Sequence, residues 1–300
     1  MPTWDKILKE VQDLPTSLNV IQNYIEQLNK QTSRTIICYL SAFSVIKPPV
    51  PQPFQSIIDQ DMQGFMTCSK DVEKNELDLI IHTPGGDYEA TKRIIGYLQS
   101  IFKNIRVFVP HMAMSGGTLM ACCADEIYMG PYSSLGPTDP QILLDEGYVS
   151  VNAIIDEFEQ AFKEVTSDLS KAVLWNERLK KIPFGQLKAI ENMRNNSLKY
   201  LVQLLQKRNC VGKTPNEIDA IAKSLNGIHS SHSEGIQLKC LQDMKLNVKD
   251  LSKQKDLEEL VLSIYHAATI LFQTSPIQKI IINHKRASYI NQFGPANFGK

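Results

Sequence analysis

The chain has 300 residues and a mass of 33.9 kDa, enough for one large domain with a core that can stabilise itself. Lys plus Arg and Asp plus Glu each number 32, so the formal net charge is zero. This balance excludes the overall basic charge typical of nucleic-acid-binding domains, and 43% hydrophobic with 21% charged residues excludes a disordered or fibrous chain.

The N-terminal part predicts two helices and then a strand. Apolar residues repeat with helical spacing through residues 7–14 and again through residues 18–28, and Pro15 separates the two segments. The compact apolar run Arg34–Ser41 predicts a buried strand. Four prolines in the next segment predict an extended loop, and a helix is expected over Phe54–Met66.

The middle of the chain alternates predicted strands with predicted helices. Buried strands are expected at Leu77–Ile81, Ile105–Val109 and Glu126–Met129, with helices at 87–102 and 115–124 between them. Short joints between such elements are typical of right-handed βαβ units around a parallel sheet. The fold class predicted from this pattern is α/β.

Beyond Pro140 the pattern becomes mainly helical. A hairpin is expected first, then helices interrupted at Pro183 and Pro215, then a mixed C-terminal part with no clear period from Ser288. We therefore divide the chain into residues 1–150, an α/β core with N-terminal helices, and residues 151–300, a mainly helical part packed on the same core. The elements expected here lie at 141–151 (hairpin), 152–226 and 233–244 and 256–274 (helices), and 277–282 (apolar run).

The cysteines and the N-terminus bear on the compartment. The six cysteines include no Cys-x-x-Cys motif, so their spacing fits neither a zinc knuckle nor a disulfide framework. The N-terminus lacks the apolar stretch of a signal peptide, and the longest apolar runs fall short of the ~20 residues that cross a bilayer. We expect reduced thiols and a cytoplasmic protein without a membrane span.

Two Gly-rich loops follow neighbouring predicted strands: Thr83-Pro84-Gly85-Gly86 and Ala113-Met114-Ser115-Gly116-Gly117. Ligands of an open α/β sheet bind beyond the carboxyl ends of its strands. Glycines permit positive φ and outward N–H groups that stabilise an anion, and Ser115 lies at a turn similar to a nucleophile elbow. Either loop alone is more simply explained as a tight turn with an N-cap. Together they predict a nucleophile beside an oxyanion hole, the minimum for acyl transfer.

Three sequence blocks carry a resemblance to a known family. The blocks are HTPGGDYEATKRIIGYL, PHMAMSGGTLMACCADEIYMG and SSLGPTDPQ, which cover about residues 78–141. In this order they resemble the Clp-like serine peptidases of the ClpP/crotonase superfold. The best match is to the serine dehydrogenase proteinase family, which is related to signal peptide peptidase A. Weaker likeness continues to the C-terminus.

The resemblance implies a fold, a site and an assembly. The fold is a ClpP/crotonase-like βαβ spiral with a mainly helical C-terminal half. The nucleophile is Ser115, and the oxyanion hole lies near Gly85, Gly86 and Gly116. Such subunits self-associate into dimers, trimers or rings, so a homo-oligomer is expected. No G-x-G-x-x-G fingerprint occurs, and neither a cofactor nor a metal is expected.

The general base is the least defined part of this predicted site. ClpP-type peptidases use a Ser-His-Asp triad and the relatives of signal peptide peptidase A a Ser-Lys dyad. The segment Ser133–Pro140, where the ClpP type keeps its histidine, contains none, so a lysine is expected. The resemblance places it at Lys163. Neighbouring phenylalanines favour a desolvated lysine there, neighbouring glutamates favour an ordinary surface lysine, and the alternatives are Lys171, Lys180 and Lys181.

Three further residues are candidates to line the site. Asp139 lies in a Pro-x-Asp-Pro turn, where it either orients a catalytic group or caps its own turn. His111 lies four residues before Ser115 and either lines the site or forms a hydrogen bond that holds the loop. His232 belongs to a block that resembles part of the family pattern and can approach from the C-terminal region. With His229 it lacks a third ligand of suitable spacing for a metal.

The sequence therefore predicts a serine hydrolase, most simply a peptidase, with a Ser115–Lys163 dyad. Its partners are peptide or protein substrates and further copies of itself, without nucleic acid or a membrane span. The alternative is a non-catalytic oligomeric scaffold of the same fold that binds a protein partner, which an exposed Lys163 remote from Ser115 would favour. Crotonase-like chemistry on an acyl thioester ranks last because it leaves Ser115 without a role.

Overall fold

Seven strands form the central sheet of the computed structural model, which describes residues 4–13, 17–48, 50–73, 75–144, 147–180, 185–227 and 235–294. The strands are β1 (Thr35–Ser41), β2 (Glu76–His82), β3 (Asn104–Val109), β5 (Glu126–Met129), β10 (Val248–Asp250), β11 (Ile277–Asn283) and β12 (Ser288–Gln292). Their order is β10-β5-β3-β2-β1-β11-β12. The first five of this order run parallel, and β11 and β12 extend the sheet antiparallel. The predicted α/β class is confirmed.

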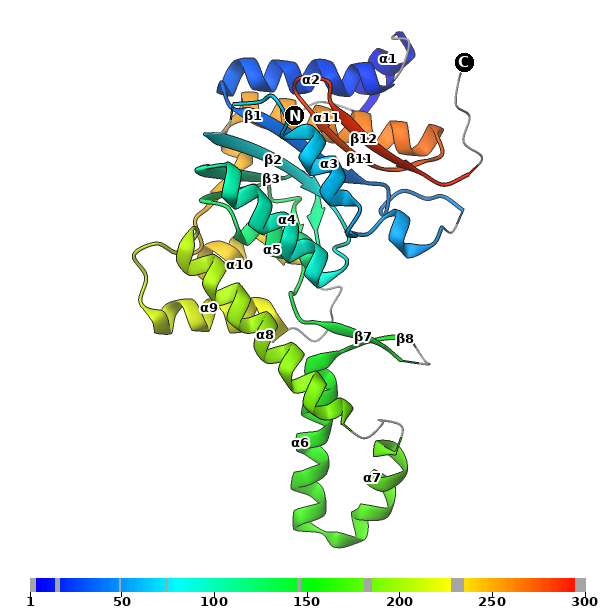
Figure 1. Cartoon of the computed structure of the whole chain (residues 1–300), viewed down its shortest axis with the longest axis vertical. Coiled ribbons are helices and arrows are strands. Elements are labelled where there is room, and N and C mark those ends of the chain that lie inside the picture. The colour runs from blue at the N-terminus through cyan, green and yellow to red at the C-terminus, as the bar shows by residue number, and fades with distance from the viewer. Residues whose placement is uncertain are drawn as a thin grey trace.

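Helices cover both faces of this sheet (Figure 1). On one face lie α1 (Trp4–Asp13), α2 (Ser17–Thr32) and α11 (Lys255–Thr274), and on the other α3 (Asp61–Cys68), α4 (Tyr88–Ile101) and α5 (Gly116–Cys122). β1 shows how one strand serves both layers. Its residues Ile36 and Cys38 pack with α2 and α11, while Ile37 and Tyr39 pack with α3 and α4. Burial on both sides explains the continuous apolar runs of the sequence.

The segment after Pro140 forms a hairpin and helices, as the sequence predicts. These elements are β7 (Gln141–Leu144), β8 (Gly147–Ser150), α6 (Val151–Ser167), η2 (Leu169–Lys171), α7 (Ala172–Leu179), α8 (Gln186–Lys207) and α9 (Pro215–Gly227). α8 and α9 pack on the main core near α5, whereas α6 and α7 project away from the sheet (Figure 1). We call α6, η2 and α7 the arm. The interruption expected at Pro183 lies outside the described residues.

Several elements differ from the expectation. The helix predicted over Phe54–Met66 begins only at Asp61, because η1 (Gln52–Phe54) and an extended segment beside Gly86 precede it. The tail from Ser288, without apolar alternation, forms β12. β10, β11 and β12 bring the C-terminal half into the central sheet. The short elements not predicted are β4 (Met112–Ala113), β6 (Ser134–Leu135), β9 (Ile236–Gln237) and η3 (Leu251–Lys253), and the helix expected at 233–244 shortens to α10 (Leu238–Asp243).

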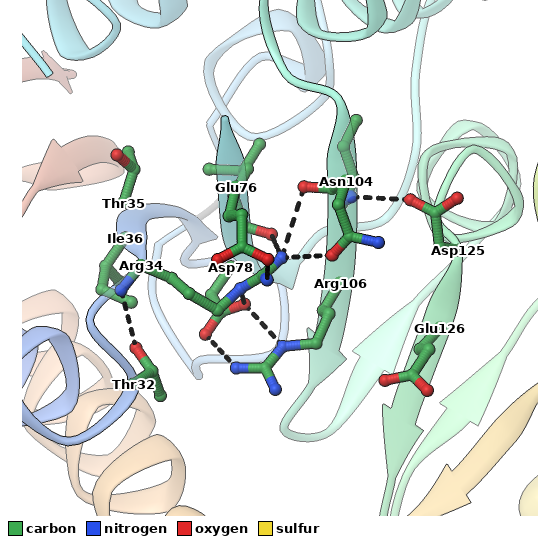
Figure 2. Close-up of polar contacts among 12 residues, drawn as sticks. Thr32, Arg34, Thr35, Ile36, Glu76, Asp78, Asn104, Arg106, Asp125 and Glu126 are labelled. Atoms are coloured by element: carbon green, nitrogen blue, oxygen red, sulfur yellow. Dashed lines mark hydrogen bonds and ion pairs between the residues drawn. The ribbon is translucent and has the colours of Figure 1, made fainter. Parts of the chain in front are cut away.

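An ionic network joins the strands toward their amino ends (Figure 2). Asp78 is fully buried and accepts hydrogen bonds from Arg34 Nε at 2.6 Å and from Arg106 Nη2 at 2.6 Å. Arg34 also donates to Glu76 and to Asn104. Each buried charge thus meets an opposite charge, as burial requires. The Gly-rich loops, in contrast, lie beyond the carboxyl ends of the strands, so this network is at the opposite end of the sheet from them.

Candidate active site

Ser115 occupies a strained turn between β4 and α5. Its backbone has φ 48° and ψ −110°, a conformation that non-glycine residues rarely adopt and that often marks a functional site. The turn is held from behind by Thr118, whose Oγ1 lies 2.9 Å from Ala113 O and 2.7 Å from Gly136 O. The Ser115 side chain is half-buried and has no hydrogen-bond partner among the described residues. The hydroxyl is therefore not bonded to its own backbone, which is the arrangement of a nucleophile elbow.

The Gly85–Gly86 loop lies directly against this turn. Gly85 has φ +89° and Gly86 φ +155°, so both need the freedom of glycine. A Cβ on Gly85 would lie 2.6 Å from Met114 O and 2.8 Å from Ser115 Cβ. A Cβ on Gly86 would lie 2.3 Å from Ile57 O. The absence of side chains thus lets two loops and the Ile57 segment meet beside Ser115.

The backbone N–H groups of the three glycines differ in availability. Gly85 N–H donates to Thr83 Oγ1 at 3.1 Å. The N–H groups of Gly86 and Gly116 have no acceptor within the part of the chain that the structure describes. The two residues are close, since a Cβ on Gly116 would lie 3.5 Å from Gly86 N. Two unoccupied donors next to a serine hydroxyl are the arrangement that stabilises an oxyanion.

A groove of about 750 Å³ opens over Ser115. Its walls come from the loop after β2, the η1 segment, the Pro-x-Asp-Pro turn, β8 and α8, a concave site of the size that binds ligands. Besides Ser115 and the glycines, lining residues include Ile57, Leu119, Thr138, Asp139, Tyr148, Met193, Asn196 and Ser197. A hollow of about 790 Å³ between α1, α2 and α11 has no serine, threonine or cysteine among its lining residues.

The candidate lysines lie away from this groove. Lys163 is exposed on α6, in the projecting arm, and no lysine or histidine of the described ranges lines the groove. Its neighbour Phe162 is 75% exposed, so one copy of the chain builds no apolar wall around Lys163. Lys180 is exposed and pairs with Glu177, and Lys171 is half-buried and pairs with Glu164. Lys181 lies outside the described residues.

The other predicted site residues divide between two faces. Asp139 is buried and lines the groove. His111 lies on the α11 side, with Nδ1 2.9 Å from Tyr265 Oη, and burial lowers its pKa. Beside it, burial and His111 lower the pKa of His82 to about 3. His232 is outside the described residues.

The sequence did not point to the Ile57 segment or to the α8 wall. Ser56 and Ile58 flank Ile57 within a run that looks helical, so no local signal marks it. Met193 and Asn196 reach the groove only because α8 packs across α5. The sequence does contain one sign of a buried ionic contact. Lys279 interrupts the apolar run Ile277–Ile282, and a charged residue inside a buried strand requires a partner of opposite charge.

Three general features of the chain bear on its environment. All six cysteines lie in the described part and form no disulfide there. The described residues contain no cluster of three side chains suited to hold a metal ion. Within the described ranges, no helix combines the length and apolar character needed to cross a bilayer.

Comparisons with known proteins give distant relatives. The uncharacterized protein MJ0137 of Methanocaldococcus jannaschii is 32% identical over 148 residues, which is 48% of this chain and 49% of the relative. The uncharacterized protein MJ1495 of the same organism is 38% identical over 96 residues, 32% of each chain. The match thus spans about half the length of the first relative and a third of the second.

A solved structure, a mutant of the 1510-N membrane-bound stomatin-specific protease, covers 67% of this chain and 79% of its own, with 15% identity and a TM-score of 0.41. This likeness is too distant to inform the site. The model of the ClpP-like SDH-type serine proteinases, in contrast, matches residues 18–285, nearly the whole described chain. That match, together with the α/β fold and the Ser115 turn, confirms the resemblance of the three sequence blocks: the chain belongs to the ClpP-like SDH-type serine proteinase family.

Proposed function

We propose that this chain is a peptidase that cleaves peptide or protein substrates bound in the groove, with Ser115 as its nucleophile. Membership of a serine proteinase family supports this class of activity. The observation that carries the proposal is the strained turn of Ser115 beside the N–H groups of Gly86 and Gly116, both without an acceptor among the described residues. These two amides form the oxyanion hole, and Gly85 keeps the loop of Gly86 against the Ser115–Gly116 turn.

The reaction proceeds by acyl transfer. Ser115 Oγ attacks the carbonyl carbon of the scissile bond, a base takes the hydroxyl proton, and the carbonyl electrons move to the oxygen. The Gly86 and Gly116 amides stabilise the oxyanion, which typically contributes about 10²–10³ in rate per donor. The C–N bond then breaks, the base returns its proton to the leaving amine, and water hydrolyses the acyl ester on Ser115 by the same steps.

The base in this proposal is Lys163 of a second copy of the chain. No lysine or histidine lines the groove of Ser115 among the described residues, while the arm presents Lys163 beside apolar side chains exposed to water. Exposed apolar groups on the arm are Phe162 (75%), Leu169 (79%), Val173 (74%) and Leu174 (76%). Contact with another copy would cover them and remove the ammonium group of Lys163 from water, which favours its neutral form.

A mixing experiment tests both parts of this proposal. We expect Ser115→Ala and Lys163→Ala each to abolish peptide hydrolysis. After the two variants exchange subunits in equal amounts, activity should return to about a quarter of the wild-type value, since half of the serines and half of the neighbouring lysines are intact. No recovery would contradict a lysine from a second copy, and unchanged turnover in Ser115→Ala would contradict the nucleophile.

A non-catalytic scaffold is the second candidate, favoured by one observation. The groove of a single copy contains no histidine or lysine among its lining residues, so it lacks a base of the usual kind. In that case the oligomer would bind a protein partner in the groove without cleaving it. Wild-type protein that assembles but hydrolyses no peptide in a diverse library would support the scaffold over the peptidase.

A further inference from the structure

A buried ion pair lies behind the proposed oxyanion loop. Lys279 of β11 and Asp61 at the start of α3 are both fully buried, with Nζ 2.7 Å from Oδ1 and 2.8 Å from Oδ2. Tyr39 of β1 donates its hydroxyl to Asp61 Oδ2 at 2.9 Å. Apolar side chains of similar volume usually stabilise such a place at least as well as an ion pair does. Stability alone therefore does not explain why an ion pair lies here, and the hydrogen bonds of the pair to nearby backbone groups give a better explanation.

Both members of the pair form hydrogen bonds with the same short backbone segment, Ser56–Ile58. Lys279 Nζ donates to Ser56 O at 2.7 Å. Ile58 N–H donates to Asp61 Oδ2 at 3.0 Å. The peptide groups on both sides of Ile57 are thus held by buried charged groups, and charge-assisted hydrogen bonds are about twice as strong as neutral ones.

Ile57 in turn holds the glycine loop. Its N–H donates to Gly85 O at 2.7 Å, and its carbonyl accepts from Asp87 N–H at 2.9 Å. Ile57 and Gly86 therefore form a parallel bridge, in which the flanking peptide groups bond to Ile57. Gly86 keeps its own N–H for the groove, and its backbone is in direct contact with that of Ile57. A continuous chain of contacts runs from Lys279 and Asp61 to the Gly86 amide.

We propose that Lys279 and Asp61 are positioning residues of the active site, which fix the direction of the Gly86 N–H by clamping Ile57 from both sides. Neither residue lines the groove, so neither touches the substrate. The inference rests on the proposed function, because it gives the clamp a role in stabilising the oxyanion. Preorganised donors act mainly on the transition state, so loosening the clamp lowers kcat and leaves KM nearly unchanged.

The test uses the full chain with Lys279→Met and Asp61→Asn, and Arg106→Met as the matched control. Arg106→Met removes the half-buried partner of the buried Asp78, at the other end of the parallel strands, and leaves the Ile57 segment untouched. We expect kcat for a peptide substrate to fall about 10- to 100-fold in the clamp variants, with KM within about threefold of wild type. Tyr39→Phe, which removes one hydroxyl and keeps the pair, should retain kcat within about threefold.

Hydrogen exchange of the hydrogen-bonded backbone amides of Ile57, Gly85 and Asp87 provides a second readout that does not depend on turnover. We expect at least tenfold faster exchange there in whichever clamp variant folds, and no change in Arg106→Met. Unchanged exchange, unchanged kcat, or an equal loss of kcat in the control would overturn the inference. Absence of Ser115-dependent turnover in the wild type would instead refute the proposed function, and the exchange data would then decide the clamp alone.

Discussion

At the scale of single residues, the site depends on backbone conformations that only certain side chains tolerate. Ser115 accepts a positive φ because neighbouring small residues leave room for the turn, and Gly85 brings its loop within contact of Ser115 Cβ. The geometry therefore depends more on missing side chains than on attractive contacts. A single added methyl group is enough to test it.

Gly85→Ala is expected to lower activity at least 100-fold and to destabilise the fold by about 1–3 kcal/mol, because alanine is strained at φ +89° and its Cβ meets Met114 O. Gly96→Ala is the matched control, since nothing lies within 4 Å of that Cβ on α4. It should stabilise the helix by about 0.5–1 kcal/mol and leave activity unchanged. Steady-state kinetics and urea unfolding measure both effects, and an active Gly85→Ala would contradict the described loop contact.

The buried histidine His82 predicts a pH dependence of stability. Its folded pKa of about 3 lies below the unfolded value of about 6.5, so between these values the unfolded chain binds one more proton. Stability is fully present above pH 6.5 and falls as the pH drops, by up to about 1.4 kcal/mol per unit from this group. In His82→Gln the fall between pH 6.5 and 4 should be shallower in urea unfolding. An identical slope would contradict a buried, neutral His82.

At the scale of elements, the strands and helices of the βαβ core follow from local pattern, and the site loops follow from their position after strands. The segment Ser56–Ile58 does not, because its extended form depends on contacts with Gly86 and Lys279, which are distant in the sequence, as well as on the nearby Asp61. The same holds for β12, whose pairing with β11 outweighs a sequence without apolar alternation. Lys163 shows another limit, since the residue is exposed in a single copy of the chain and its neighbours in the sequence do not decide whether a second copy covers it.

The arm exposes apolar side chains that a second copy of the chain can cover. Phe162 and Leu174 are 75% and 76% exposed, so replacing both by Ser removes little packing within one copy. If they contact a second copy, the double variant should weaken self-association at least tenfold and lose peptidase activity in parallel, with an unfolding temperature close to wild type. Analytical ultracentrifugation measures the association. Undiminished assembly together with full activity would exclude the arm from the interface.

At the scale of the whole molecule, the amino and carboxyl ends of the parallel strands are built differently. The amino-terminal edge is tied by the Arg34–Asp78–Arg106 network, in which every buried charge is paired (Figure 2). The opposite ends carry the strained serine turn, the groove and two backbone amides that have no acceptor among the described residues. The C-terminal half contributes to both layers, because α8 forms a groove wall and β11 supplies Lys279 behind the glycine loop. The buried ionic network and the candidate active site thus lie at opposite ends of the strands.

Covalent labelling shows whether Ser115 is an activated nucleophile. Purified wild-type protein, at a concentration where it is assembled, is treated with a fluorophosphonate probe beside Ser115→Ala, and intact mass is measured. We predict one phosphonyl adduct per chain in the wild type, located on Ser115 by peptide mapping, and none in the variant. Equal labelling of both proteins, or an unlabelled wild type in its assembled state, would show that Ser115 is not an activated nucleophile.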